Sequence, residues 1–582
     1  MSPVCIVPAR GGSKGIPDKN LRAVGGISLV GRAVRAGREF LRRSGLTGAR
    51  LVVDTDSEAI AAEGRAWGAE VPWLRPAGLA RDTTSTVEST LALLDRLEAA
   101  GPIDAVVLLQ PTSPLRTDAD ILACWQMFAP ADRPSVISIA ENPHPMELGL
   151  HLGPSGTLEW AGPGAVPKRR QEYAPSYRPS GAVYVTTVEL LRSAGAFIVP
   201  GVTRGVVLPA ERAVDVDHPH DLIVAEALVA ARPVTPVALG SGAIGPGHRC
   251  FVIAEAGVNH NGDPALAHRL VDLAAEAGAD AVKFQTFDPD LVVAAGARKA
   301  DYQIANTGAG ESQRDMLRRL VLPRAEFKVL ARHAADRGLL FLSTPFDEGS
   351  ADFLDDLGLA AFKVPSGEIT NHPFLAHLAV KGRPLLVSTG MSTLVEVGGA
   401  LDTIAAHGDP AVALLHCVSN YPAAPADCNL RSMDTMRRAF RAPVGWSDHT
   451  LGVTVSLAAV AAGAEVLEKH FTVDRSLPGP DHAASLEPGE LRELVESIRV
   501  IEMSRGTGCK VPAPSEAANA QLVRRSLHAT RELAPGHVLT AEDLVALRPG
   551  TGVSPGARDR LIGRAVRRRI GAGEMVSEDQ LA

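Results

Sequence analysis

Residues 250–287 read CFVIAEAGVNHNGDPALAHRLVDLAAEAGADAVKFQTF, and this stretch decides the fold of the longest domain that the sequence predicts. Two short apolar runs enclose a segment with helical spacing of its apolar residues, which is typical of a strand–helix–strand unit. The pattern recurs through residue 505, so that eight apolar runs follow one another: CFVIAEAG, AVKFQTF, LLFLSTPFD, AAFKVPSGE, PLLVSTGM, VALLHCVSN, APVGWSDH and EVLEKHF. Eight such units predict a (β/α)8 barrel.

Polar side chains stand where these runs end, and active sites of such barrels lie at that face. His449 and His470 end the seventh and eighth runs. Adjacent strands would bring them close enough to bind one divalent metal. The alternative is that both histidines are structural.

Lysines and glutamates occupy other run ends. Lys283 and Lys363 offer positive charge for a phosphate and a carboxylate, and Glu255 and Glu368 are candidate acid/base groups. An alternative interpretation is a Schiff-base aldolase that uses Lys283 or Lys363 and needs no metal.

The first 230 residues form another α/β pattern. The runs VCIVP (4–8), ARLVVDT (49–55), AVVLLQ (105–110), SVISIA (135–140) and GAVYVT (181–186) alternate with helical stretches. This alternation predicts a doubly wound parallel sheet.

The first of these runs leads into VPARGGSKGIPDKN (7–20). Adjacent glycines let a backbone approach an anion and point its N–H groups inward, and Arg10, Lys14 and Lys19 add charge. The pattern is not a Walker A loop. It predicts nucleotide phosphate binding, and the alternative is a solvated basic turn.

Composition shifts mark the domain boundaries. Residues 231–249 are rich in Pro, Gly and small side chains without periodicity, which predicts a flexible linker. We therefore expect a domain over 1–230, the linker over 231–249, the barrel over 250–505 and a small β-rich domain over 522–582.

Charge and cysteine usage limit the partners. The net charge is −7 and no basic stripe is present, which argues against a nucleic-acid partner. We expect no signal peptide and no membrane span. The six cysteines are scattered without a CxxC pair, which indicates reduced thiols in the cytoplasm.

The N-terminal region resembles the CMP-sialic acid synthetases, or acylneuraminate cytidylyltransferases. The resemblance rests on ARGGSKGIPDKN, RPAGLARDTTST (75–86), LLQPTSPLRT (108–117), RRQEYAPSYRPSGAVYV (169–185) and VDVDHPHDL (214–222). It implies that CTP is bound by Arg10, Ser13, Lys14, Lys19 and Asn20, and that the sugar faces Gln110, Arg170 and Arg178. Asp215 and Asp217, two residues apart in an extended segment, project the same way and suit Mg²⁺.

The barrel region resembles the sialic acid synthases, which condense phosphoenolpyruvate with a sugar. The resemblance rests on IAEAGVNHNGD, AVKFQTF, FKVPSGEITN, STGMS, LHCVSNYP, GWSDHT and EKHFTVDRSLPGPDHAASLEP. It implies catalytic roles for Glu255, Lys283, Glu368, Tyr421 and Asp481, substrate contacts from Gln285, Lys363, Ser366 and Ser419, and a metal, Mn²⁺ or another divalent ion, on His449 and His470.

Residues 522–582 resemble the antifreeze-like (SAF) domain that ends these synthases. The resemblance implies a homodimer or a higher oligomer, in which the SAF domain is swapped onto the partner's barrel and Arg548 of one subunit reaches the sugar site of its partner.

Together the two resemblances imply consecutive reactions. Phosphoenolpyruvate and an N-acylated hexosamine, such as N-acetylmannosamine, give a nonulosonic acid and phosphate, and CTP then activates that acid to its CMP-sugar with release of pyrophosphate.

Three alternatives remain open. Ser419 stands where sialic acid synthases often carry Asn, and KVPSGE with Pro365 favours the legionaminic-type branch, so the acceptor is either N-acetylmannosamine or a 2,4-diacetamido-trideoxy sugar of the legionaminic or pseudaminic series. One catalytic half acting only as a binding or oligomerisation module is a second alternative. A synthase and cytidylyltransferase pair of the Kdo type is a third.

Overall fold

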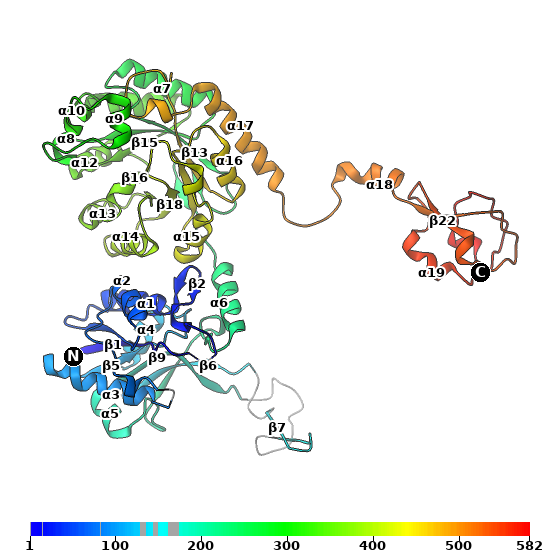
Figure 1. Ribbon diagram of the computed structural model, residues 1–582, viewed down its shortest axis with the longest axis horizontal. Coiled ribbons are helices and arrows are strands. Elements are labelled where there is room, and N and C mark those ends of the chain that lie inside the picture. Colours follow the sequence, from blue (N-terminus) through cyan, green and yellow to red (C-terminus); the bar gives the residue numbers. More distant parts are fainter. Residues whose placement is uncertain (1, 14, 82, 129–134, 144–148, 161–173) are drawn as a thin grey trace. The chain divides into compact units, whose positions relative to one another are not determined.

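The computed structural model of the protein describes residues 2–13, 15–81, 83–128, 135–143, 149–160 and 174–582. The chain divides into two compact units, Met1–Met503 and Ser504–Ala582, and each is described by itself (Figure 1).

The N-terminal part of the first unit is a six-stranded sheet with the strand order β10-β6-β9-β5-β1-β4. All its strands run in one direction except β9, which is antiparallel to β5 and β6. The strands are β1 (Pro3–Pro8), β4 (Arg50–Asp54), β5 (Ala105–Leu108), β6 (Val136–Glu141), β9 (Tyr177–Thr187) and β10 (Arg204–Val207). The sheet is therefore mixed at β9, whereas the alternation of strand and helix predicts parallel strands throughout.

Helices cover both faces of this sheet. One apolar core joins it to α1 (Leu29–Ser44), α2 (Glu58–Ala66) and α4 (Asp118–Phe128), and a second core joins it to α3 (Thr86–Leu97) and α5 (Val188–Ala194). Local sequence sets the ends of α1, because the Ser28 side chain accepts from the Gly31 amide at its start and Gly45 takes a positive φ at its end. The predicted doubly wound architecture is confirmed. The part ends with α6 (Pro219–Ala231), and short hairpins are formed by β2 (Ala23–Val24) with β3 (Ile27–Ser28) and by β7 (Leu150–Leu152) with β8 (Leu158–Trp160).

The C-terminal part of the first unit is the predicted (β/α)8 barrel. Its parallel strands follow the order β15-β14-β13-β20-β19-β18-β17-β16, and contact between β15 and β16 closes the ring. All eight apolar runs form strands: β13 (Phe251–Gly257), β14 (Ala281–Thr286), β15 (Leu340–Pro345), β16 (Phe362–Val364), β17 (Leu385–Ser388), β18 (Val412–Cys417), β19 (Val444–Asp448) and β20 (Val466–His470).

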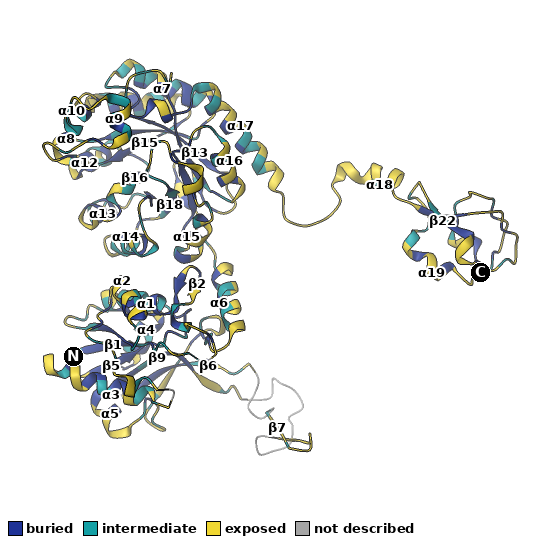
Figure 2. Cartoon of the chain, viewed as in Figure 1, coloured by how far each residue is buried: buried dark blue, intermediate teal, exposed yellow. Residues whose placement is uncertain are grey.

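A helix follows every strand and packs outside the barrel, where buried strands stand against half-exposed helices (Figure 2). These helices are α7 (Pro264–Glu276), α11 (Arg324–Asp336), α12 (Glu348–Leu357), α13 (His372–Ala379), α14 (Leu394–Ala406), α15 (Ser432–Phe440), α16 (Thr454–Ala461) and α17 (Pro488–Arg505). Three short helices lie in the connection between β14 and α11: α8 (Pro289–Val292), α9 (Asp301–Thr307) and α10 (Gln313–Arg318).

The segment 231–249 differs from the flexible linker that its composition predicts. It forms a hairpin of β11 (Val237–Leu239) and β12 (Gly242–Ile244). Val237, Leu239 and Ile244 are buried in one core with Phe251 and Val466, which begin two barrel strands. The hairpin therefore closes the amino-terminal end of the barrel. Three correctly spaced apolar side chains decided its structure, although the surrounding Pro and Gly suggest a loop.

The second unit has a small apolar core of its own. Its regular elements are α18 (Ala517–Val523), β21 (Ser526–Ala529), β22 (Leu544–Leu547) and α19 (Arg558–Leu561), with β21 and β22 antiparallel. Among the helices that the structure describes, in either unit, none combines the length and the apolar character needed to cross a membrane.

Candidate active sites

Strand register brings the barrel's polar residues to one level. Glu255 on β13 is the direct neighbour of Lys283 on β14 and of His470 on β20. Because side chains alternate along a strand, Glu468 points to the same side as His470. Polar groups from several strand ends therefore meet inside the barrel at its carboxyl end.

Two lysines and two glutamates form a buried network there. The Lys283 Nζ lies 2.6 Å from Glu255 Oε2 and 3.5 Å from Glu468 Oε2, and the Lys363 Nζ lies 3.1 Å from Glu468 Oε1. Ser447 donates to Glu468 at 2.9 Å, and Lys283 donates to Thr344 at 3.0 Å. The charged side chains are at most 5 % exposed, so their charges compensate one another without help from water.

The pKa values of the two glutamates are shifted in opposite directions. Burial raises the pKa of Glu255 to about 7, because the attraction of Lys283 only partly offsets the loss of solvent. Burial alone would also raise the pKa of Glu468, but Lys283 and Lys363 outweigh it and hold that pKa well below its ordinary value. Glu468 is therefore a fixed anion, and Glu255 is able to exchange a proton near neutral pH.

The two histidines fit a divalent metal. Their ring centroids are 5.7 Å apart, and burial lowers the pKa of both, to about 4 for His449, so both imidazoles are neutral. The His449 Nδ1 is 2.7 Å from the Val418 carbonyl oxygen and donates to it, which leaves Nε2 with its lone pair. Within the described part of the chain, the buried Nδ1 of His470 has no hydrogen-bond partner. Neutral imidazoles with uncommitted nitrogens are typical of metal ligands.

These groups line a cavity of about 300 Å³. The ring centroids of Tyr421 and His449 are 4.1 Å apart. Burial raises the pKa of Asp481 to about 6. The cavity brings together ten of the residues that the sequence analysis singles out: Glu255, Lys283, Gln285, Lys363, Ser366, Ser419, Tyr421, His449, His470 and Asp481.

Glu368 is not among the residues that line this cavity. It lies in a turn after β16, and its carboxylate accepts from the Asn371 side chain at 2.7 Å, at the start of α13. Its catalytic role stays a prediction.

Sequence reasoning missed several lining residues, of which Glu468 is the most important. The strand period of two, counted back from His470, is a signal that would have found it. Ser447 precedes His449 by the same interval. Thr344 and Ser388 stand at the ends of β15 and β17, so their strand-end positions were a signal as well. Tyr302 and Gln303 carry no such signal, because they come from the inserted helix α9.

In the N-terminal part, hydrogen bonds hold the C-terminal end of the glycine-rich loop, at Lys19 and Asn20. The buried side chain of Asn20 donates to the Arg10 carbonyl at 2.9 Å. Lys19 Nζ donates to the Val216 carbonyl at 3.0 Å and lies 3.1 Å from Asp217 Oδ1. The loop therefore lies against the segment that carries both aspartates. Ser13 is half-buried in the same loop.

Asp215 lies deeper than Asp217. Burial raises its pKa, and its buried Oδ1 has no hydrogen-bond partner among the residues that the structure describes. A Cβ on Gly181 would lie 2.9 Å from Gln110 Oε1 and 3.6 Å from Asp215 Oδ2, so glycine leaves room where these side chains meet. An orphaned carboxylate oxygen beside a second carboxylate suits Mg²⁺.

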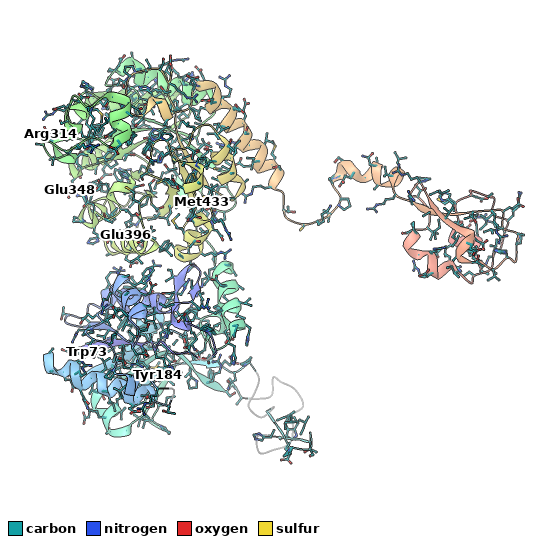
Figure 3. All side chains as sticks on the ribbon, in the orientation of Figure 1. Trp73, Tyr184, Arg314, Glu348, Glu396 and Met433 are labelled. Atoms are coloured by element: carbon teal, nitrogen blue, oxygen red, sulfur yellow. The ribbon has the colours of Figure 1, made fainter. Side chains whose placement is uncertain are left out.

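Neighbouring groups in β9 complete this region. Arg178 donates to the Ala213 carbonyl at 3.4 Å, close enough to Asp215 to favour its ionised form. Tyr184, labelled in Figure 3, has its pKa raised by burial and by the charge of Asp215. Lys14 and Arg170 lie outside the described residues. Arg548 is exposed at the end of β22 in the second unit.

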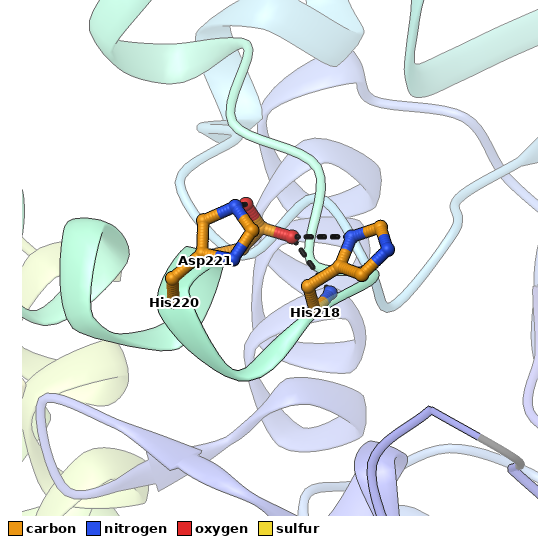
Figure 4. Close-up of side chains that lie close together, drawn as sticks. All are labelled: His218, His220 and Asp221. Carbon is orange, nitrogen blue, oxygen red and sulfur yellow. Dashed lines mark hydrogen bonds and ion pairs between the residues drawn. The ribbon is translucent and has the colours of Figure 1, made fainter.

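One further cluster follows Asp217 directly. His218 and His220 stack with ring centroids 5.4 Å apart, and Asp221 lies 3.6 Å from His218 Nδ1 and 3.2 Å from His220 Nε2 (Figure 4). Among the described residues this is the only group of three or more His, Cys, Asp or Glu side chains within reach of one ion. Both rings are exposed, and Asp221 already accepts from the His218 amide at the start of α6. The cluster is therefore explained as a helix cap.

Three family models match the chain in sequence order: a cytidylyltransferase over 4–147, the NeuB family over 270–510 and the SAF domain over 524–582. An N,N'-diacetyllegionaminic acid synthase of Legionella pneumophila is 49% identical over 328 residues, which are 56% of this chain and 92% of that protein. A synthase of the same name from Campylobacter jejuni is 43% identical, over 57% of this chain and 99% of its own length. N-acetylneuraminate-9-phosphate synthase of Homo sapiens is 35% identical, over 58% of this chain and 94% of its own length.

Proposed function

This chain belongs to the NeuB family, and we propose that it makes a nonulosonic acid and then activates it as a CMP-sugar. It is an enzyme that joins a synthase domain to a cytidylyltransferase domain and a SAF domain. The observation that carries the proposal is the barrel cavity, where Lys283, Lys363 and the histidine pair face one space. Those groups suit an acid with a phosphate and a carboxylate, such as phosphoenolpyruvate.

The lysines bind and orient phosphoenolpyruvate. Each ammonium is held by a buried carboxylate, so its position is set before the substrate arrives. Carbon 3 of phosphoenolpyruvate then forms a bond to the aldehyde carbon of the sugar. Water adds at carbon 2 and phosphate leaves, which gives a 2-keto-3-deoxy acid.

Proton transfer falls to the groups whose pKa values lie near neutrality. Glu255, with a pKa of about 7, and Asp481, with a pKa of about 6, are able to take up or release a proton as water adds and phosphate departs. Tyr421 keeps its proton because burial holds its pKa well above the ordinary value, so it acts as a hydrogen-bond donor. A divalent metal held by His449 and His470, Mn²⁺ or a similar ion, would supply Lewis-acid polarisation of the aldehyde oxygen.

The N-terminal domain would activate the product. The glycine-rich loop receives the phosphates of CTP, while Gln110 and Arg178 face the sugar acid. The anomeric hydroxyl attacks the α-phosphorus and pyrophosphate leaves. Mg²⁺ on Asp215 and Asp217 would neutralise the charge that develops on the phosphate oxygens.

Sequence identity favours one acceptor. The Legionella relative, named for N,N'-diacetyllegionaminic acid, is 49% identical, whereas the human relative, named for N-acetylneuraminate 9-phosphate, is 35% identical. We therefore propose a 2,4-diacetamido-trideoxy hexose as the acceptor, with N-acetylmannosamine as the second candidate. A cytoplasmic location, a homodimer and a role for Arg548 at the partner's sugar site stay predictions.

One experiment tests the whole proposal. The full chain is given phosphoenolpyruvate, CTP, Mg²⁺, Mn²⁺ and either acceptor, while phosphate and pyrophosphate are measured separately and the product is weighed by mass spectrometry. Both ions with one acceptor would support two working domains and identify the sugar. If only phosphate appears, the N-terminal domain either is inactive or does not accept the product. An assay with purified nonulosonic acids and CTP then distinguishes these two cases.

The alternatives predict different results. Neither ion with any acceptor would contradict the proposal and favour a binding module. Turnover of arabinose 5-phosphate in place of N-acylated sugars would favour the Kdo type. Full synthase activity in the presence of a chelator would favour a Schiff-base aldolase.

A further inference from the structure

An ion pair lies behind the two histidines, on the outer side of the barrel wall. Asp448 on β19 and Lys469 on β20 are register partners, and each is followed in the chain by one of the histidines, His449 and His470. Lys469 Nζ lies 3.0 Å from Asp448 Oδ2, and the two side chains are 1 % and 0 % exposed. Because side chains alternate along a strand, this pair points away from the cavity that the imidazoles face.

Hydrogen bonds from this pair enclose His449 on both sides. Asp448 Oδ1 accepts from the Thr450 amide and from its hydroxyl, each at 2.8 Å, and Oδ2 also accepts from Ser456. Lys469 Nζ donates to the Thr450 carbonyl as well as to Asp448. One ammonium group thus holds both residues that flank His449, and it belongs to the residue before His470.

This arrangement matters because regular pairing ends there. Asp448–Lys469 is the last register pair between β19 and β20, and β19 ends at Asp448. The position of His449 therefore depends on bonds outside the sheet. These are the Ala423 amide, which donates to the His449 carbonyl at 2.9 Å, the bond from His449 to the Val418 carbonyl, and the side-chain bonds of Asp448 and Lys469 to its neighbours. A buried ion pair adds little to net stability, because desolvation offsets its attraction.

We infer that Asp448 and Lys469 are a positioning pair that sets the separation of His449 and His470 for one divalent ion. The inference rests on the proposed metal site of the synthase domain. It assigns a role to two residues that touch neither the cavity nor a substrate.

The test measures Mn²⁺ binding to the full chain by calorimetry and electron paramagnetic resonance, without substrate. Wild type should bind one ion in the barrel, and His449→Ala should lose it. Asp448→Asn and Lys469→Met should each weaken Mn²⁺ binding by about 10–100-fold, the usual effect of groups that orient metal ligands. The double variant should be no weaker than the poorer single variant, because the two residues act as a unit.

Lys299→Met is the matched control. Lys299 is also a buried lysine with three acceptors, namely Thr307, Gly308 and Glu311, and its side chain is 1 % exposed, but it orders the inserted helices instead of the histidines. Its replacement should leave Mn²⁺ binding unchanged.

Two outcomes separate the inference from the proposal on which it rests. If wild type binds Mn²⁺ through His449 but Asp448→Asn and Lys469→Met bind it equally well, the positioning role is wrong and the metal site stands. If His449→Ala changes nothing, the metal site is wrong and the inference falls with it. If both variants fail to fold, Ser456→Ala replaces them, because it removes only one donor to Asp448. A few-fold loss of Mn²⁺ affinity in this variant would support the positioning role, and an unchanged affinity would contradict it.

Discussion

The barrel cavity and the glycine-rich loop both gather cations for anionic ligands, but they hold them differently. In the cavity, Lys283 and Lys363 are at most 5 % exposed and each is paired with a buried glutamate. In the loop, Lys19 is 16 % exposed and its partner Asp217 is 61 % exposed. Charge in the barrel is therefore fixed by protein groups, whereas charge at the loop is shared with solvent.

This difference shows how the two domains would meet their ligands. The barrel has already met the cost of burying its charges, so a substrate enters a site of set geometry. In the loop, the Gly11 N–H already donates to Asp56 Oδ1 at 2.8 Å, whereas the Asp217 carboxylate is largely exposed, so that a nucleotide and its ion would complete the arrangement.

The largest effect is expected from His449→Ala. Phosphate release from phosphoenolpyruvate should fall by about a thousandfold or more, because Lewis-acid stabilisation is worth several kcal/mol and each ~1.4 kcal/mol is tenfold in rate. Pyrophosphate release from CTP and a purified nonulosonic acid should not change. A normal synthase rate in this variant would contradict the proposal that His449 holds a catalytic metal.

Glu468→Gln tests the buried network. It leaves two lysines with one carboxylate, and loss of one partner in a buried ion network costs about 3–5 kcal/mol in the free energy of unfolding. Asp217→Asn, which removes one partner of an exposed pair, should cost about 1 kcal/mol or less. Denaturant unfolding of both variants measures the contrast, and equal losses would contradict it.

Asp215→Asn should lower CTP turnover by roughly a hundredfold, since it removes an oxygen that would hold the ion stabilising the transition state. The synthase rate should be unaffected. Coupled assays for phosphate and pyrophosphate on one preparation separate the two reactions, and equal damage to both would mean that Asp215 serves folding.

The raised pKa of Asp481 should make the stability of the barrel depend on pH. Burial raises its pKa from 3.8 to about 6, so the folded chain binds the proton more tightly than the unfolded chain. The stability that this group contributes is present below pH ~3.8 and is lost as pH rises to about 6, by up to ~1.4 kcal/mol per pH unit. Wild type should therefore lose stability relative to Asp481→Asn across that window. Hydrogen exchange of barrel amides measures it, and parallel pH profiles would contradict the burial effect.

Asn20→Ala should have the smallest effect. It removes one hydrogen bond to the Arg10 carbonyl, worth about 1 kcal/mol, so the KM for CTP should rise about fivefold with kcat little changed. Steady-state kinetics of the CTP reaction measure this change. A much larger loss would mean that the loop is as rigidly built as the barrel site.

Local patterns in the sequence were sufficient for much of this protein. Apolar runs and helical spacing determined the eight β/α units, because strand and helix periods follow from backbone geometry. The strand-end positions of His449, His470, Lys283 and Glu255 then placed them on one face of the barrel. Adjacent glycines and cations marked the loop near Asn20, whose contacts within the loop are local.

Tertiary structure alone decided what depends on distant partners. It turned β9 antiparallel, folded 237–244 into a hairpin against the barrel, and gave Glu468 both lysines as partners. It also directed Glu368 to Asn371, since the strand period ends where β16 becomes a turn. Closure of the barrel sets which charges share a water-poor space, and that space sets the pKa of Glu255. No local spacing records it, because Glu255, Lys283 and Glu468 come from three separate strands that meet only in the folded barrel.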